Sequence, residues 1–373
     1  MKKLLQQLLN AMGIEIRLLK SLQHQSREAC PEQKKILSGV PVKGALMTFP
    51  RITVITPSFN QGKYIGDTIN SVKKQNYPNL EYIIIDGGST DETVEVIKSS
   101  CSVISYWVSE PDNGQSHAIN KGIARATGDI ISWINSDDLL ADGALHAIAE
   151  AWEKNPGVLG VIGRIEMFNE QGVFRRTTSI LSSTLEETIG YGKVAQPAMY
   201  FSTEAYRNIG LLNEKLHYMM DTEWYLRFLL HYGQDRLIEI DQLIALFRLH
   251  ESSKTVAMAE KFRLERDSLY YSIALRFGQN EVAEFLLKYA KVNPQISISN
   301  AEGDPSIIAR VLNYFIYQLG QEYYYYGVTR KCKACFKFVN TEMLSSNDQH
   351  KLRKLSFRVN FIPAPVLKFL KTR

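Results

Sequence analysis

The chain has 373 residues, of which 45% are hydrophobic and 22% charged, and its formal net charge is +5. This composition is ordinary for a soluble α/β protein of one large or two modest domains, and the modest charge argues against a nucleic-acid partner. No run of about 18 apolar residues occurs, so we expect no membrane-spanning helix and exclude a polytopic synthase.

The four cysteines are too few and too scattered for a disulfide framework, and no signal peptide is visible. We therefore expect a protein of the reducing cytoplasm. Cys332 and Cys335 form a C-x-x-C pair, but no second pair or nearby histidine completes a zinc set. Since a spacing of three also defines one face of a helix, we favour packing over metal or redox chemistry for this pair.

Residues 1–23 place leucines and other apolar residues at spacings of three and four between lysines and glutamines, which predicts an amphipathic helix. Such a helix could lie on a membrane, or pack on the domain or on a second subunit of a homo-oligomer. Without a lipidation signal we favour packing. The polar, proline-containing segment 23–50 predicts a linker, so residues 1–49 are expected to precede a first domain at 50–256.

From Arg51 onward, short runs of β-branched residues alternate with amphipathic segments. The runs predict strands at 51–57, 80–85 and 103–108, each followed by a helix, at 64–75, 92–99 and 116–126. This alternation is typical of a parallel sheet. Successive strands end in acidic, glycine-containing loops, which a doubly wound sheet brings together along one edge.

A fourth strand is predicted within 128–134, and it ends abruptly in the polar segment Asn135–Asp138. Paired carboxylates at the carboxyl end of a strand form an oxygen-rich site suited to Mg²⁺ or Mn²⁺, and such a cation would attract phosphates. The alternative is that Asp137 and Asp138 only cap a helix beginning at Leu139.

The chain thus carries, in order, the motifs Pro57–Asn60, Asp86–Asp91, Asp112–Gly114 with Ala118–Gly122, and Asn135–Asp138. Across roughly residues 50–255, this ordered set resembles the signature of family 2 glycosyltransferases. The resemblance implies a GT-A fold, an α/β fold whose mixed, Rossmann-like sheet binds a nucleotide. In this chain a helical C-terminal extension would follow it.

The resemblance also implies roles for individual residues. It makes Asp86 the residue that recognises the nucleobase and Asp137 the ligand of a Mn²⁺ or Mg²⁺ ion that bridges the donor diphosphate. Two positions depart from the family pattern, because Asn135 replaces the first carboxylate of a D-x-D motif and His117 stands where related sequences often carry Asp. Asn135 can still accept from a ribose hydroxyl, and Asp138 is a second candidate metal ligand. The other implied donor contacts are Pro57, Ser58, Asn60, Asp112, Lys121 and Ser136.

The acceptor half has predicted strands at 158–165, 167–175, 198–201 and 243–249. A buried helix is predicted around 217–228, and the resemblance makes Asp221, at its start, the catalytic base. Glu223 is the second candidate for that role, and Arg227 is expected to be structural. A simple N-cap is the alternative role for Asp221.

Three further residues join the candidate site. The resemblance places His250 on a loop that closes over the diphosphate and can ligate the metal, and imidazole is an apt ligand for Mn²⁺. Lys254 follows on the same loop. Gln196, which precedes Pro197, is a candidate of second rank.

Residues 257–373 are expected to form a helical region, with helices at 261–277, 280–292, 306–319 and 322–339. The tail from Lys351 to Arg373 holds seven lysines or arginines and no acid, interleaved with leucines and phenylalanines. This pattern suggests a peripheral contact with an anionic membrane, on the inner face of the plasma membrane. The alternative is a solvated basic face whose apolar stripe packs on the helical region.

Together these features predict an inverting, metal-dependent enzyme that moves one hexose or N-acetylhexosamine from a UDP- or GDP-linked donor to a glycan or lipid-linked acceptor, in polysaccharide or glycolipid assembly. The Q-x-x-R-W motif typical of processive family members is absent, which favours a single addition. The alternatives are a sugar-nucleotide binding protein without turnover and, less favoured, a nucleotidyltransferase.

Overall fold

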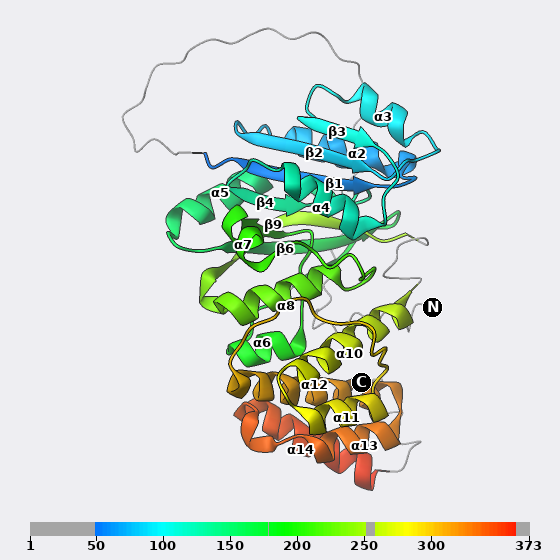
Figure 1. The fold of residues 1–373 in the computed structure, drawn as a ribbon, viewed down its shortest axis with the longest axis vertical. Coiled ribbons are helices and arrows are strands. Elements are labelled where there is room, and N and C mark those ends of the chain that lie inside the picture. The colour runs from blue at the N-terminus through cyan, green and yellow to red at the C-terminus, as the bar shows by residue number, and fades with distance from the viewer. Residues whose placement is uncertain (1–48, 178, 251–257, 363–373) are drawn as a thin grey trace.

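The computed structural model describes residues 49–177, 179–250 and 258–362. The predicted helix at 1–23, Lys254, the boundary at 256–257 and the tail beyond residue 362 lie outside these residues. Within them, an α/β sheet is followed by a stack of helices, which Figure 1 shows below the sheet.

In the part of the chain that the structure describes, nine strands form one mixed sheet in the order β3-β2-β1-β4-β8-β6-β9-β5, with β7 paired to β6. β1 is parallel to β2 and β4, and β2 is parallel to β3, whereas β8 is antiparallel to β4 and β6. The predicted Rossmann-like half and mixed sheet are therefore confirmed. The strands are β1 (Ile52–Ser58), β2 (Leu80–Asp86), β3 (Tyr106–Ser109), β4 (Ile130–Trp133), β5 (Leu139–Leu140), β6 (Gly160–Asn169), β7 (Gly172–Arg176), β8 (Met199–Ser202) and β9 (Leu237–Arg248).

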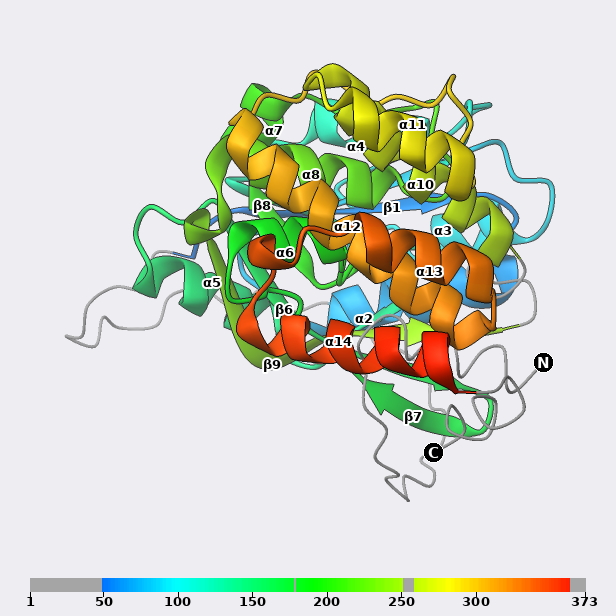
Figure 2. The same cartoon turned by 90° about the horizontal axis from the view of Figure 1, so that it is seen from below.

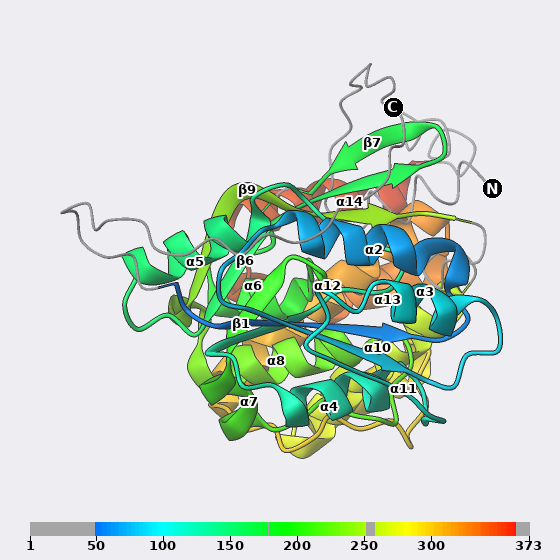
Figure 3. The same ribbon diagram turned by 90° about the horizontal axis from the view of Figure 1, so that it is seen from above.

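Helices cover both faces of the central strands, which explains why every residue of β1 and β4 is buried. Figure 3 shows α2 and α5 on one side of β1 and α4, α7 and α8 on the other. The helices of this half are α2 (Gly62–Lys74), α3 (Thr93–Ser99), α4 (Gln115–Arg125), α5 (Ala144–Lys154), α6 (Leu185–Tyr191), α7 (Thr203–Ile209) and α8 (Met220–Tyr232).

No helix begins at Leu139. Leu139 and Leu140 form the short strand β5, antiparallel to β9, and α5 begins only at Ala144. The alternative that Asp137 and Asp138 merely cap a helix is therefore wrong. Directly after the polar segment, the chain instead enters β5, which pairs with β9 at the edge of the sheet.

The C-terminal region is helical, as predicted, but one predicted break is absent. A single helix spans Pro305–Tyr326, although we expected an interruption between residues 319 and 322. Gly320 lies inside it, where a Cβ would come within 2.6 Å of the Phe336 ring, so this glycine permits close packing of two helices and breaks neither. Figure 2 shows the stack from below. The helices are α10 (Ala259–Arg276), α11 (Asn280–Tyr289), α12 (Pro305–Tyr326), α13 (Thr329–Phe338) and α14 (Ser346–Phe361).

One continuous hydrophobic core joins the sheet to this helical stack. α12 contacts α6, α10, α13 and α14, and the Tyr270 hydroxyl of α10 donates to the carbonyl of Ile189 in α6. Cys332 and Cys335 are both buried in the core on α13, as the packing interpretation predicted. Among the described helices, none has the length and apolar character needed to span a bilayer.

Candidate active site

The carboxyl ends of four parallel strands meet at one edge of the sheet. In the register of β3-β2-β1-β4, Ser58 pairs with Asp86, and Asp86 pairs with Ser109. The amide of Gly87 donates to the carbonyl of Ser58 at 2.8 Å, which locks the first two loops together. The predicted acidic loops are therefore neighbours in space, at the edge where α/β sheets bind ligands.

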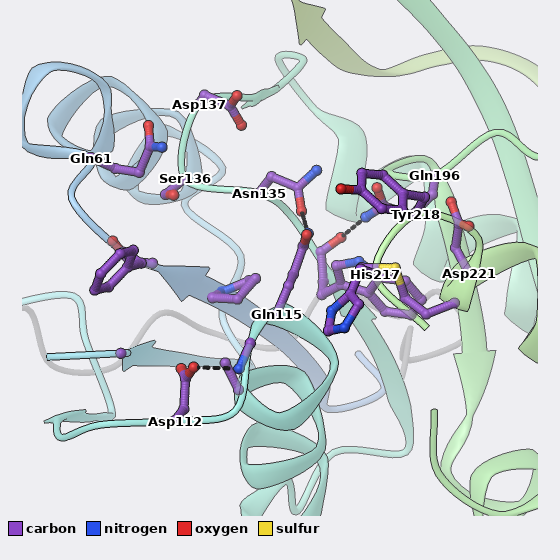
Figure 4. Close-up of a pocket in the computed structure, with 18 of the residues that line it drawn as sticks. Gln61, Asp112, Gln115, Asn135, Ser136, Asp137, Gln196, His217, Tyr218 and Asp221 are labelled. Carbon is purple, nitrogen blue, oxygen red and sulfur yellow. Dashed lines mark hydrogen bonds between the residues drawn. The ribbon is translucent and has the colours of Figure 1, made fainter. Parts of the chain in front are cut away.

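A pocket of about 560 Å³ opens at this edge. Figure 4 shows Gln61, Asp112 and Ser136 toward one end and Gln196, Tyr218 and Asp221 toward the other. Its size and its mixed lining suit a small-molecule site. The lining residues are Pro57, Ser58, Phe59, Gln61, Gly87, Asp112, Gly114, Gln115, Ala118, Trp133, Asn135, Ser136, Asp137, Gln196, His217, Tyr218, Met220, Asp221, Phe247, His250 and Phe262.

Two of the lining residues, at the end of β1 and just before α2, each carry a buried polar atom. Ser58 Oγ and Gln61 Oε1 are buried and have no hydrogen-bond partner among the described residues. Buried polar groups are normally satisfied, so these two atoms are exceptions within the pocket wall. Ser58 was predicted from the sequence to contact the donor, whereas Gln61 was not.

Asp86 lies behind the pocket wall. Its side chain is fully buried, and its carboxylate accepts from the amides of Gly88 and Ser89 at 3.1 and 2.9 Å and from the Ser109 hydroxyl at 2.6 Å. The lining at this position is Gly87, where a Cβ would come within 2.7 Å of the Asp112 carboxylate. Asp86 therefore shapes the loop after β2 and does not line the pocket. The carboxylate that lines the pocket near Gly87 is that of Asp112.

Asn60 and Lys121 also lie outside the lining. Asn60 adopts a left-handed backbone with φ of 52°, and its side-chain oxygen accepts from the amide of Thr90 at 2.9 Å. This hydrogen bond holds the loop after β2 against the loop after β1. The Lys121 ammonium pairs with Glu110 at 2.8 Å. Both residues support the loops that shape the pocket.

The side chains of the segment after β4 lie partly in the pocket lining and partly in the protein interior. Asn135, Ser136 and Asp137 line the pocket, whereas Asp138 is buried behind them. Asp138 accepts from the amide of Arg248 at 2.9 Å and from Nδ2 of Asn135 at 3.2 Å, and burial raises its pKa. Its position is structural, which removes it as a candidate that could reach a metal in the pocket.

Asp137 and His250 face each other across the mouth of the pocket. Asp137 Oδ2 lies 3.0 Å from His250 Nε2, and the His250 ring stacks on Tyr64 of α2 with a centroid distance of 4.7 Å. A carboxylate and an imidazole at this spacing match two adjacent ligands of one octahedral cation. These two side chains would supply two ligands of a divalent ion; among the described residues no third His, Cys, Asp or Glu joins them.

Asp221 lies at the opposite end, in the first turn of α8. Burial raises the pKa of its carboxyl, and the amide of Thr222 donates to it at 2.6 Å. The N-cap residue of α8 is Met219, with no side-chain cap. The N-cap alternative for Asp221 is therefore not observed, and its carboxylate lines the pocket with Gln196, whose amide donates to the carbonyl of Trp133 at 2.8 Å.

Glu223 does not reach the pocket. It is fully buried and forms two hydrogen bonds with Arg227, at 3.0 and 2.9 Å, while the amide of Ser299 donates to it at 2.7 Å. Arg227 also donates to the carbonyl of Leu211 at 2.7 Å. The pair fastens α8 to its surroundings, so Glu223 is not a second candidate base, and Arg227 is structural as expected.

Several lining residues were missed from the sequence. Gln115 starts α4 and donates to Oδ1 of Asn135 at 2.8 Å. Tyr218 precedes α8, and Phe262 comes from α10, with the two rings 5.2 Å apart. Gln115 directly follows the predicted Asp112–Gly114 loop, which was a usable signal. Phe262 lies beyond the resembling segment, and its sequence context carries no such signal.

The fold is an α/β fold of the GT-A type, with a pocket at the edge where such sheets bind ligands. The sequence model described as Glycosyl transferase family 2 matches residues 53–227. An uncharacterized glycosyltransferase of Mycobacterium tuberculosis strain CDC 1551 is 31% identical over 179 residues, which cover 48% of this chain and 68% of the relative. The chain therefore belongs to glycosyltransferase family 2, and it is an enzyme that transfers a sugar.

Two further similarities extend this comparison. A poly-beta-1,6-N-acetyl-D-glucosamine synthase of Staphylococcus epidermidis is 26% identical over 151 residues, covering 40% of this chain and 37% of the relative. The structure of S. aureus TarS residues 1–349, solved with UDP-GlcNAc, superposes with a TM-score of 0.55 at 17% identity and covers 86% of this chain and 90% of the other. This likeness to TarS concerns the fold, and it includes the helical region beyond the family match.

Proposed function

We propose that this protein is an inverting, metal-dependent glycosyltransferase that adds a single sugar from a nucleotide-diphosphate sugar to an acceptor hydroxyl. One observation carries the proposal: the strand-end loops and Asp221 line opposite ends of the same pocket. A donor whose nucleotide lies against Ser58, Gly87 and Asp112 would direct its sugar toward Asp221. The acceptor would then enter beside Asp221.

Asp221 is the proposed general base. It accepts the proton of the acceptor hydroxyl as that oxygen attacks the anomeric carbon, while the bond to the diphosphate breaks on the opposite face. A single displacement of this kind inverts the anomeric centre. Burial raises the pKa of Asp221, which makes its ionised form a stronger base than an exposed aspartate.

Asp137 and His250 are the residues that would hold the proposed Mn²⁺ or Mg²⁺ ion. When bound, such a cation neutralises the charge that develops on the departing diphosphate. The chain's own contribution is to fix these two side chains. His250 stacks on Tyr64, and the Arg248 side chain donates to the backbone carbonyl of Asp137 at 2.9 Å.

The proposed setting is the assembly of a cell-surface polysaccharide or glycolipid. The staphylococcal relative named as a poly-beta-1,6-N-acetyl-D-glucosamine synthase supports this setting and suggests an N-acetylhexosamine donor. The test is a panel of UDP- and GDP-linked sugars, with nucleotide release and product linkage measured with and without Mn²⁺ and candidate glycan acceptors. Retention of the anomeric configuration in the product would overturn the mechanism. Release of nucleotide with no sugar transferred to any acceptor would favour a hydrolase.

We further propose that the protein docks on an anionic membrane through α14. The Phe357 and Phe361 side chains are 59% and 72% exposed and lie 5.1 Å apart between ring centroids. Arg353 and Lys354 are exposed one turn earlier, and the acid of this helix, Asp348, is buried. Exposed aromatic rings beside cations suit the interface of an anionic bilayer.

A further inference from the structure

The loop that precedes α8 is held by a carboxylate from the helical region. Glu265 of α10 is 5% exposed, and it accepts from the amides of His217, Tyr218 and Met219 at 3.0, 2.9 and 2.9 Å. These three amides directly precede the turn that carries Asp221. Hydrogen bonds to an ionised acceptor are stronger than neutral ones, so one side chain fixes three successive peptide groups.

The same face of α10 also reaches the pocket itself. Phe262, one turn before Glu265, lines the pocket and packs edge to face on the Tyr218 ring, at a centroid distance of 5.2 Å. Residues three apart share one helix face, so Glu265 holds the backbone of this loop while Phe262 packs on its side chain. Both residues lie beyond the family match at 53–227.

We propose that Glu265 is a positioning residue for Asp221, and that α10 thereby makes the helical region part of the active site. This inference rests on the proposed role of Asp221 as general base. The N-cap residue of α8 is Met219, whose own side chain makes no capping hydrogen bond. Glu265 is the acceptor for the three amides that lead into α8, and it thereby sets where the first turn of α8, and with it Asp221, faces the pocket.

The alternative is that Glu265 only stabilises the fold. α10 offers a matched control in Asp267, which is also buried, pairs with Arg266 at 2.7 Å and accepts from the amide of Lys291 at 3.0 Å. Asp267 makes none of the three bonds to the loop. Substitution of either carboxylate by its amide removes one buried charge from the same helix, but only the Glu265 substitution disturbs the backbone before Asp221.

The experiment compares Glu265→Gln with Asp267→Asn in the full chain. The glutamine retains one acceptor oxygen, which cannot satisfy three amides. We expect kcat to fall at least about tenfold in Glu265→Gln, and by no more than the roughly 10²–10⁴-fold that the general base itself supplies. Donor Kd should change less than about twofold, because the nucleotide end is built by other loops. Asp267→Asn should lower Tm and retain kcat.

Amide hydrogen exchange across residues 214–222 gives a readout that is independent of activity. Exchange should accelerate in Glu265→Gln and stay unchanged in Asp267→Asn. Unchanged exchange in Glu265→Gln, or a loss of kcat in both variants that follows their loss of Tm, would overturn the positioning role. Failure of the proposed function has a different signature, namely near-normal turnover of Asp221→Asn with Glu265 intact.

Discussion

Asp137 Oδ2 and His250 Nε2 lie 3.0 Å apart, although 113 positions separate the two residues in the chain. Strand β9 brings them together, because its end at Arg248 is tied to the Asp137–Asp138 segment by two hydrogen bonds of 2.9 Å. Two independent parts of the sequence thus deliver a carboxylate and an imidazole to one point of the pocket. Each is suited to a divalent cation.

We expect Asp137→Ala to abolish Mn²⁺-supported turnover and to weaken donor binding, with folding largely intact. His250→Ala should reduce the affinity for Mn²⁺ less severely, because a carboxylate ligand remains. Calorimetric titration of Mn²⁺ in the presence of nucleotide measures both effects. A control is Asp142→Ala, an exposed acid outside the pocket lining. Full activity in excess EDTA would refute the metal requirement.

The structure adds a stability cost to the substitution of Asn135 by aspartate. From the sequence, Asn135→Asp should retain or raise metal affinity, because it restores a carboxylate to the motif. However, Nδ2 of Asn135 donates to the buried Asp138 carboxylate at 3.2 Å. An aspartate would remove that donor and place a carboxylate directly beside the buried Asp138 carboxyl, whose pKa burial already raises. We therefore expect Asn135→Asp to lower the free energy of unfolding by about 1–3 kcal/mol.

A double substitution checks this explanation of Asn135. Asp138→Asn replaces the buried carboxyl that the new aspartate would face, so Asn135→Asp should cost less stability in that background than in the wild type. Urea unfolding of the four proteins in the cycle gives the coupling energy. Additive effects would show that the two side chains do not interact as described.

The sequence predicted the sheet well because its information is local. Short β-branched runs that end in polar loops define four parallel strands, and their ends must meet at one edge. Pocket residues such as Ser58, Asp112 and Asp137 followed from motifs at those ends, whereas Asp221 followed from the family resemblance. Which side chain faces the pocket depended on tertiary packing, and this is why Asp86 lies behind the wall.

Contacts from distant segments could not be predicted in the same way. Glu223 follows Asp221 by two residues and has the same chemistry, yet α8 turns it into the core toward Arg227 and Ser299. Phe262 reaches the pocket from a helix that lies beyond the family motifs. A local sequence pattern could predict neither the direction of the Glu223 side chain nor the position of Phe262, because both depend on how the helical stack packs on the sheet.

Glu223→Ala tests the structural role of the buried pair. The substitution leaves Arg227 buried without its carboxylate and the amide of Ser299 without its acceptor. Breaking a buried ion pair costs about 3–5 kcal/mol, so the free energy of unfolding should fall by that amount. Thermal melts and urea titrations measure it, with the exposed pair residue Glu150→Ala as the control. A small change in the free energy of unfolding together with a loss of turnover would make Glu223 a candidate catalytic residue again.

The membrane proposal makes a prediction about α14. Phe357→Ser with Phe361→Ser should weaken binding to both anionic and neutral vesicles, because apolar area is lost. Arg353→Glu with Lys354→Glu should weaken binding to anionic vesicles alone, since basic residues contribute about 1 kcal/mol each at such a surface. Leu287→Ser, at an exposed position of α11, is the control. Equal vesicle binding by all variants would contradict the proposal that α14 contacts the membrane.

Asp221 is the residue on which the proposed mechanism depends most. We expect Asp221→Asn to reduce kcat roughly 10²–10⁴-fold with donor Kd nearly unchanged, because the substitution removes the base and keeps the size of the side chain. Glu204→Gln is the control, since Glu204 is an exposed acid in the first turn of α7. A kcat near the wild-type value for Asp221→Asn would remove Asp221 from the mechanism.

The pH profile gives a second, independent measure of this base. Burial raises the pKa of Asp221, with the nearby charge of Glu265 acting in the same direction. A general base works only when ionised, so kcat/KM should fall as the pH drops through this raised pKa. The acidic limb should lie above the value of about 3.9 of an ordinary aspartate. It should be missing from the residual activity of Asp221→Asn, and an unshifted limb in that variant would assign the titration to another group.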